Sequence, residues 1–169
     1  DYGYREVGQE YLQNVLNTDK KLDAYDSGRI YYYLGDYQKA YLALEEAKGK
    51  GGVDSYLYLG KAYAATGDYN YASSVYSNYL SKQGPDAEIY NQLGLCELAK
   101  KDYQKALEAF QAGKQIEGNS LMQTLSFNEI VAYEYLQDYQ KAAVLLKAYL
   151  QNYPDDQAAI REQQFLSTR

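Results

Sequence analysis

Within residues 36–139 the dipeptide Asp-Tyr occurs four times at nearly constant spacing, and this repetition constrains the fold more than any other feature of the sequence. The copies are separated by intervals of 32, 34 and 36 residues and begin at Asp36, Asp68, Asp102 and Asp138. Each tyrosine is followed three residues later by an alanine. Four residues after the alanine comes a large apolar residue, which is Leu44, Tyr76, Phe110 or Leu146. Such an interval is typical of chains that stack one small supersecondary unit repeatedly.

The spacing within each copy predicts a helix that begins at the Asp-Tyr dipeptide. Separations of three, four and seven residues place the tyrosine, the alanine and the large residue on one helical stripe. Aspartate is a good N-cap, because its carboxylate accepts from the free amides of the first turn. Gly35 and Gly67 precede two of these dipeptides and suit the left-handed position that ends a helix. Each unit is therefore predicted to be a helix, a tight turn and a second helix.

The first helix of each unit carries its own stripe, which contains a glycine. Tyr56, Leu59, Gly60 and Tyr63 lie on one face of the second unit's first helix. A glycine inside a helix costs about 1 kcal/mol relative to alanine. Its recurrence at Gly28, Gly60 and Gly94 therefore indicates a packing reason, namely close approach of the paired helix.

These motifs resemble the tetratricopeptide repeat, which is marked by a small residue in the first helix, an aromatic residue three positions later, a turn tyrosine and alanines in the second helix. Pro85 and Pro154 stand near the ends of units, as the family pattern expects. The resemblance implies an all-α, right-handed superhelical solenoid of helix-turn-helix repeats. We expect one domain over residues 1–169, with repeats at 21–52, 53–86, 87–122 and 123–154.

The repeat pattern is imperfect in places. Glu97 replaces the first-helix aromatic of the third repeat. The fourth repeat has Ser126, Glu129 and Ile130 where apolar, apolar and small residues are expected, and a shift of one residue gives no better match, so its register stays open. Residues 1–20 are predicted to form a partial repeat, with the second helix of a truncated unit over residues 4–17. Residues 155–169 are predicted to form a capping helix, which the exposed end of a solenoid needs.

Composition argues against several classes of function. The chain has 17 Lys and Arg against 23 Asp and Glu, a net charge of −6, so no basic face is available for nucleic acid. It has no histidine and a single cysteine, Cys96, which removes the commonest catalytic bases and metal ligands. We therefore expect no enzyme activity, no metal and no cofactor.

The sequence also bears on membranes and compartment. No apolar run approaches the ~20 residues of a membrane-spanning helix, so we expect no membrane insertion by this chain. The sequence begins at Asp1 rather than at methionine, so we expect that the N-terminus has been trimmed and that any targeting segment has gone with it. The polar, tyrosine-rich composition resembles that of bacterial envelope-anchored repeat modules, and we expect a bacterial, extracytoplasmic protein.

A curved stack of this kind presents a concave surface lined by the first helices, and the resemblance implies that this surface binds peptide segments of partner proteins. Helical geometry places the groove residues opposite the packing stripe. The candidate ligand-groove residues are Tyr25, Asp26, Arg29, Tyr32, Tyr33, Tyr58, Lys61, Asn91, Gln92, Asn128 and Tyr135. Their neighbours at the same helical positions are Leu57, Ala64, Ala65, Leu95, Leu98, Ala99, Phe127, Val131 and Glu134. One subtype of the family binds chaperones with a clamp of Lys and Asn side chains from successive first helices. Only Asn91 and the basic groove residues resemble that clamp, so chaperone binding is not expected.

The groove accounts for part of an unusual tyrosine content. The chain has 23 tyrosines and no tryptophan. Twelve tyrosines occupy packing positions of the repeat, and five fall on the predicted groove. Exposed tyrosine favours binding surfaces, because it offers a large contact area and a hydroxyl group. Alternatively, these rings pack against neighbouring first helices or a terminal segment.

Three functions remain open from the sequence. The first is a protein-protein interaction scaffold that binds a partner peptide or protein segment in a tyrosine-rich groove. The second is a self-assembly module that forms a homo-oligomer through its exposed end helices. The third is an envelope module whose tyrosines stack on the sugar rings of a glycan, which the absence of tryptophan disfavours.

Overall fold

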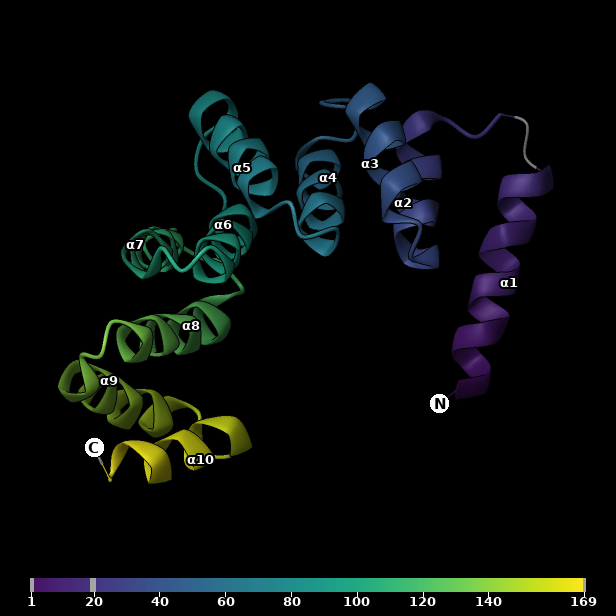
Figure 1. The fold of residues 1–169 in the computed structure, drawn as a ribbon. Helices are drawn as coiled ribbons and strands as arrows, with labels where there is room; N and C mark the ends of the chain where they lie inside the picture. The colour runs from purple at the N-terminus through teal and green to yellow at the C-terminus, as the bar shows by residue number, and fades with distance from the viewer. Residues whose placement is uncertain (1, 19–20, 169) are drawn as a thin grey trace. The chain divides into compact units, whose positions relative to one another are not determined.

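The structure is a computed structural model that describes residues 2–18 and 21–168, with side chains described from residue 5 onward. The described residues form α-helices joined by short turns, and no strand occurs among them. They divide into two compact units, within residues 1–82 and 83–169. The first unit holds α1 (Tyr2–Thr18), α2 (Ala24–Leu34), α3 (Tyr37–Glu46), α4 (Val53–Ala65) and α5 (Tyr69–Gln83). The second holds α6 (Ala87–Ala99), α7 (Tyr103–Lys114), α8 (Met122–Tyr135), α9 (Tyr139–Asn152) and α10 (Gln157–Leu166). Successive helices of each unit pack on one another, as α8, α9 and α10 do in Figure 1.

The aspartate of each Asp-Tyr dipeptide caps the second helix of a repeat, as the sequence predicted. In α3, α7 and α9 the capping carboxylate accepts a hydrogen bond from the backbone N–H of the lysine three residues later. In α5 the carboxylate of Asp68 accepts from the N–H of Tyr71 at 3.0 Å. Each such cap stabilises its helix by about 1 kcal/mol.

The residue before each aspartate has a left-handed backbone conformation. Gly35 and Gly67 have φ values of 81° and 87°, and Lys101 and Gln137 occupy the same position with φ values of 65° and 63°. Glycine adopts this region without steric cost, whereas a side chain with a Cβ is strained there. The turn geometry is therefore retained in all four repeats, although only two of them have the favourable residue.

The glycines of the first helices fit against one large side chain of the second helix. A Cβ at Gly60 would overlap the ring of Tyr76, with 2.5 Å to Cε1, and a Cβ at Gly94 would lie 2.7 Å from Cδ1 of Phe110. A Cβ at Gly28 would lie 2.5 Å from Cγ of Leu44. The expectation that glycine recurs for close helix packing is confirmed.

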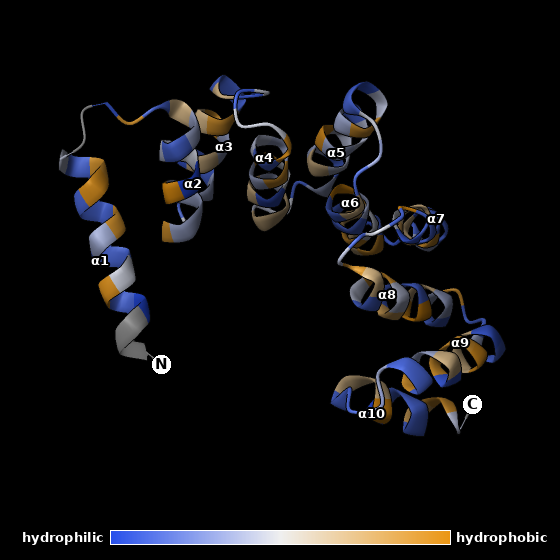
Figure 2. Cartoon of the chain, turned by 180° about the vertical axis from the view of Figure 1, so that it is seen from behind, coloured by the Kyte–Doolittle hydropathy of each residue, from blue (hydrophilic) through white to orange (hydrophobic). Residues whose placement is uncertain are grey.

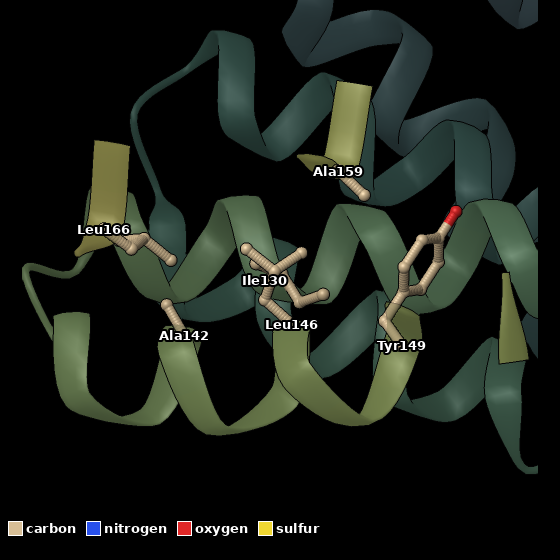
Figure 3. Packing of buried hydrophobic residues seen from close by; sticks show 6 residues of the cluster. All are labelled: Ile130, Ala142, Leu146, Tyr149, Ala159 and Leu166. Carbon is tan, nitrogen blue, oxygen red and sulfur yellow. The ribbon is translucent and has the colours of Figure 1, made fainter. Parts of the chain in front are cut away.

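The fourth repeat keeps the unshifted register of the other three. The N–H of Asp138 donates to the carbonyl of Tyr133 at 3.0 Å, as that of Asp68 donates to Tyr63. Ile130 therefore stands at the glycine position, and it packs with Ala142 and Leu146 in a buried cluster (Figure 3). Because Gly28 has no room for a Cβ beside Leu44, Ile130 beside Leu146 requires a wider spacing of α8 and α9.

The two terminal helices pack differently. In α10, Asp156 caps the helix, and Ala159 and Leu166 are buried against α9 in the cluster of Figure 3. In α1, apolar bands alternate with hydrophilic ones (Figure 2), and no described side chain is buried. Counted back by one repeat interval, Ala40, Leu44 and Ala47 of α3 and its C-cap correspond to Gly8, Leu12 and Val15 of α1. The three later residues are fully buried. In α1, Gly8 is exposed and the other two are half-buried, since no first helix among the described residues precedes α1.

Candidate partner-binding face

Seven of the predicted groove residues lie on α2 and α4 in the first unit, and we call this surface the α2/α4 face. Asp26 and Tyr33 are exposed, and the other five are half-buried: Tyr25, Arg29, Tyr32, Tyr58 and Lys61. The i, i+3 and i+4 spacing places these residues along one side of α2 and α4, where Tyr32 also contacts Tyr37 of α3 at 5.7 Å between ring centroids. Leu57, expected beside them, is instead buried in α4.

Three tyrosine rings of the α2/α4 face contact one another across the two helices. Tyr32 lies 5.7 Å from Tyr33 and 5.5 Å from Tyr58, centroid to centroid, both in edge-on geometry. The hydroxyl oxygens of Tyr33 and Tyr58 are 2.6 Å apart and share a hydrogen bond. The alternative that these rings pack on a neighbouring first helix therefore holds for part of their surface. Tyr33 nevertheless keeps 54% of its surface exposed.

Two tyrosines of this cluster, Tyr32 and Tyr33, have a pKa above the ordinary value and are therefore neutral at pH 7. The hydrogen bond to Tyr58, together with burial, raises the pKa of Tyr33. Burial raises the pKa of Tyr32, and the neighbouring Tyr37 and Tyr58 add to the effect. Neutral phenols are both donors and acceptors of hydrogen bonds, so the face offers polar contacts without negative charge from the rings.

The guanidinium of Arg29 lies between two of the tyrosine rings. Its Cζ is 5.2 Å from the ring centroid of Tyr25 and 5.3 Å from that of Tyr58. Such cation–π contacts contribute about 0.5–1 kcal/mol each at exposed sites. An Nη atom of Arg29 lies 3.8 Å from Oδ1 of Asp26. The Nε atom of Arg29 is buried and has no hydrogen-bond partner among the described residues.

The charge of Arg29 persists in this setting. Burial disfavours the charged guanidinium, but the adjacent Tyr25 and Tyr58 outweigh this effect and raise the pKa of Arg29. The side chain is 38% exposed. The α2/α4 face therefore presents a fixed positive group that an acceptor from solvent can reach.

The turn before α4 holds Tyr25 in place. A Cβ on Gly51 would lie 2.6 Å from Cε2 of Tyr25, so the ring lies directly against the backbone of that turn. The hydroxyl of Tyr25 donates to the carboxylate of Asp54 at 3.4 Å. Burial raises the pKa of Tyr25, although the nearby Arg29 opposes this. The sequence pattern did not predict this contact between Gly51 and Tyr25.

The remaining four predicted groove residues lie in the second unit, where their environments differ. Asn91 is only 5% exposed, and it accepts a hydrogen bond from Asn128 at 2.9 Å, which joins α6 to α8. The amide of Gln92 donates to Glu88 at 2.9 Å. Tyr135 is 54% exposed and stacks on Tyr103 at 4.9 Å. Asn91 and Asn128 thus link two helices, whereas Tyr135 offers surface.

The described part of the chain shows no arrangement suited to a metal or to a membrane span. No group of three or more Cys, Asp or Glu side chains gathers at metal-binding distance within residues 5–18 and 21–168. Within the helices that the structure describes, none is both long enough and apolar enough to cross a bilayer.

Comparison with known families identifies the class of protein. Two family models, each described as tetratricopeptide repeat, match residues 57–120 and 127–156, which together make up more than half of the chain. The chain belongs to the tetratricopeptide repeat family. The expected all-α solenoid fold is confirmed.

One curated relative and several solved structures are similar to the chain. Tetratricopeptide repeat protein 21B of Xenopus laevis is 28% identical over 153 residues, which are 89% of this chain and 10% of that protein. The chain thus spans about a tenth of the length of that relative. The crystal structure of the MamA protein has a TM-score of 0.73 and 21% identity, covering 85% of this chain and 78% of that one. MamA from Desulfovibrio magneticus RS-1 has a TM-score of 0.70 and 20% identity, covering 92% and 89%.

A further solved structure contains a bound peptide. It is the second repeat domain of the human RPAP3 protein in complex with the HSP70 peptide SGPTIEEVD, solved by NMR. Its TM-score is 0.58 at 16% identity, and the match covers 65% of this chain and 90% of that one. At identities this low, the likeness to each of the solved structures is one of fold.

Proposed function

We propose that the chain is a non-catalytic protein-interaction scaffold and that its α2/α4 face binds a segment of a partner protein. Membership of the repeat family supports a protein partner, as does a fold neighbour that was solved with a peptide. The observation that carries the proposal is the guanidinium of Arg29, held between two rings beside the exposed Tyr33. Tyrosine and arginine are enriched among the residues that dominate binding energy at protein interfaces.

The chemistry of the α2/α4 face suggests how a segment would bind. The guanidinium of Arg29, whose side chain is 38% exposed, would meet a carboxylate or a backbone carbonyl of the partner, as would the ammonium of the half-buried Lys61 on α4. The rings around Arg29 are already ordered by contacts with one another, so binding costs little side-chain entropy. Asp26 and Asp54 flank the arginine and would disfavour a strongly acidic segment at those two edges.

The test uses variants that leave the helices intact. The native chain is immobilised, extract of the source cells is passed over it, and bound proteins are identified by mass spectrometry. Arg29→Met keeps the aliphatic stem but removes the charge, and Tyr33→Ala removes the exposed ring. Tyr71→Ala is the matched control, because Tyr71 is an exposed tyrosine on α5.

The proposal expects one partner that the native chain and the Tyr71→Ala control retain and that both face variants lose. Circular dichroism checks that all variants keep their helicity. Equal retention by all four proteins would exclude the α2/α4 face as the binding surface.

Self-association is the second candidate function, and the outer surface of α1 favours it. Val7 and Tyr11 are 66% and 68% exposed one helical turn apart. Apolar surface of this kind on an end helix could pair with a second copy of the chain. Light scattering across a range of concentrations tests this idea. A mass that stays at the monomer value of 19.3 kDa would rule it out, and a larger mass that Val7→Asp abolishes would support it.

A further inference from the structure

The second unit contains a cavity that the proposed scaffold function does not use. It has a volume of about 400 Å³ and lies among α7, α8 and α9. Its lining includes Lys114, Met122, Ser126, Glu129, Ile130 and Tyr149. Figure 3 shows Ile130 and Tyr149 at the packed interface of α8 and α9. Cavities that bind small groups usually measure about 300–1,000 Å³, so this one is large enough to hold a side chain.

Comparison of the repeats shows that the cavity occupies the place of an aromatic ring. Ser126 stands seven residues before Tyr133, and at the same position the second and third repeats have Tyr56 and Tyr90. In the second repeat the ring of Tyr56 packs edge-on against Tyr79, with 5.1 Å between centroids. The repeat interval aligns Tyr79 with Tyr149, which lines the cavity. Serine therefore removes from the fourth repeat the ring that packs on Tyr79 in the second, and Tyr149 packs instead on Phe127 and Tyr153, at 5.6 and 4.8 Å between ring centroids.

A second departure from the repeat pattern widens the same region. Ile130 replaces the glycine that lets the two helices of a repeat approach closely. As argued above, Ile130 beside Leu146 sets α8 and α9 further apart. Ile130 is itself 1% exposed and forms part of the cavity wall. The loss of a ring and the wider helix spacing together account for the open volume.

The cavity also has a polar edge, where the second and third repeats are apolar. Glu129 replaces Leu59 and Leu93 of the second and third repeats, and it is only 6% exposed. Its carboxylate pairs with Nζ of Lys114 at 2.6 Å and accepts from the amide of Gln111 at 2.8 Å. Burying an ion pair in place of leucine gives little or no net stability. The position of the Glu129–Lys114 ion pair on the cavity wall indicates a role in recognising a bound group.

We propose that this cavity is a second binding site, which accepts a tyrosine side chain of a partner protein. The ring would lie against Tyr149 and Ile130, in the place that the chain's own tyrosine takes in the second repeat. The phenol hydroxyl, which is both donor and acceptor, would contact the carboxylate of Glu129 or the ammonium of Lys114. The site is independent of the α2/α4 face, since it lies wholly in the second unit.

The single methionine of the chain provides a direct measurement. Met122 lines the cavity and is the only methionine in the sequence, so methyl-labelled methionine gives one NMR resonance. N-acetyl-tyrosine amide is titrated into the native chain, and the corresponding phenylalanine and leucine amides serve as comparison compounds. The tyrosine compound is expected to shift the methionine resonance saturably, the phenylalanine compound to bind more weakly, and the leucine compound to have no saturable effect.

Variants separate the cavity from nonspecific binding. Ser126→Tyr fills the cavity from within and is expected to abolish the shift. Thr124→Tyr places the same ring on the exposed surface of α8 and is expected to leave the shift intact. Arg29→Leu, in the other unit, adds no methionine and is expected to have no effect on the titration. Loss of binding in Arg29→Leu, or its persistence in a folded Ser126→Tyr, would overturn the proposal.

The native chain decides the question even if Ser126→Tyr does not fold. Equal binding of the leucine and tyrosine compounds would show a general apolar hole and would refute selection of a tyrosine. Lys114→Leu, which removes the ammonium without adding a methionine, is expected to remove the preference for the tyrosine compound over the phenylalanine compound. An unchanged preference in that variant would refute the role given to the charged pair.

Discussion

Replacement of Gly60 by alanine tests the packing rule on which every repeat depends. In an open helix this change stabilises the fold by about 1 kcal/mol, because alanine is the better helix former. At Gly60 the new Cβ would overlap the ring of Tyr76, which is fully buried and whose hydroxyl donates to the carbonyl of Leu57. Overpacking of a rigid core costs about 1–3 kcal/mol. The two terms leave a net destabilisation of about 1 kcal/mol.

Urea unfolding followed by circular dichroism measures this difference. With a typical slope of about 2 kcal/mol per molar urea, the Gly60→Ala midpoint is expected about 0.5 M below that of the native chain. Gly8→Ala is the matched control, because Gly8 lies in a helix with no atom within 4 Å of its added Cβ. Gly8→Ala is expected to leave the midpoint unchanged or raise it. In a Tyr76→Val background the alanine at position 60 is expected to be tolerated.

The opposite result would refute the reasoning. If Gly60→Ala raised the midpoint as the control does, the glycine would not be needed for helix approach. Tyr76 would then have room to move, and the recurrence of glycine at this position would need another cause.

Three further predictions follow from single residues. Lys101→Gly is expected to raise the free energy of unfolding by up to about 1 kcal/mol, because glycine has no strain in the left-handed backbone conformation at φ 65°. Urea unfolding measures this gain. Lys101→Ala keeps the strain and is expected to show no gain. Burial and the hydrogen-bonded carboxyl of Glu162 raise the pKa of Glu134 to about 7 from the ordinary value of 4.5. Because the folded state then holds this proton more tightly, stability is expected to fall as the pH rises from about 5 to about 8, and Glu134→Gln should flatten the slope of urea midpoints against pH. Burial raises the pKa of Cys96 to about 12, so a thiol reagent is expected to label it only as urea unfolds the chain, and rapid labelling of the folded protein would contradict its burial.

Local rules explain why much of the fold was predictable. An aspartate before an apolar stripe caps a helix wherever it occurs, so Asp36 and Asp138 could be interpreted without tertiary information. The pairing of Gly94 with Phe110 followed from the fixed interval, since each partner recurs at the same place in other repeats. The α2/α4 face followed from helical periodicity alone.

Features that depend on contacts between distant side chains were harder to predict. Helical geometry placed Asn91 in the predicted groove, but its side chain is buried and accepts a hydrogen bond from Asn128, 37 positions away. The left-handed backbone at Gln137 carries no glycine signal, and only alignment with Gly67 indicates it. Ser126 was visible as a departure from the pattern, but the cavity it opens depends on how α7, α8 and α9 pack around it.

The fit between a small residue on one helix and a large one on the next has an evolutionary consequence. The second helix of the second repeat carries Tyr76, whose ring has room only opposite a glycine. It could therefore not pack against the first helix of the fourth repeat, which has Ile130 at that position. Helices therefore cannot be exchanged singly between repeats, whereas whole hairpins can be duplicated with their partners already matched. Variation in such a chain is expected to arise in pairs of substitutions within one hairpin, which leaves the exposed faces of the first helices free to diverge independently.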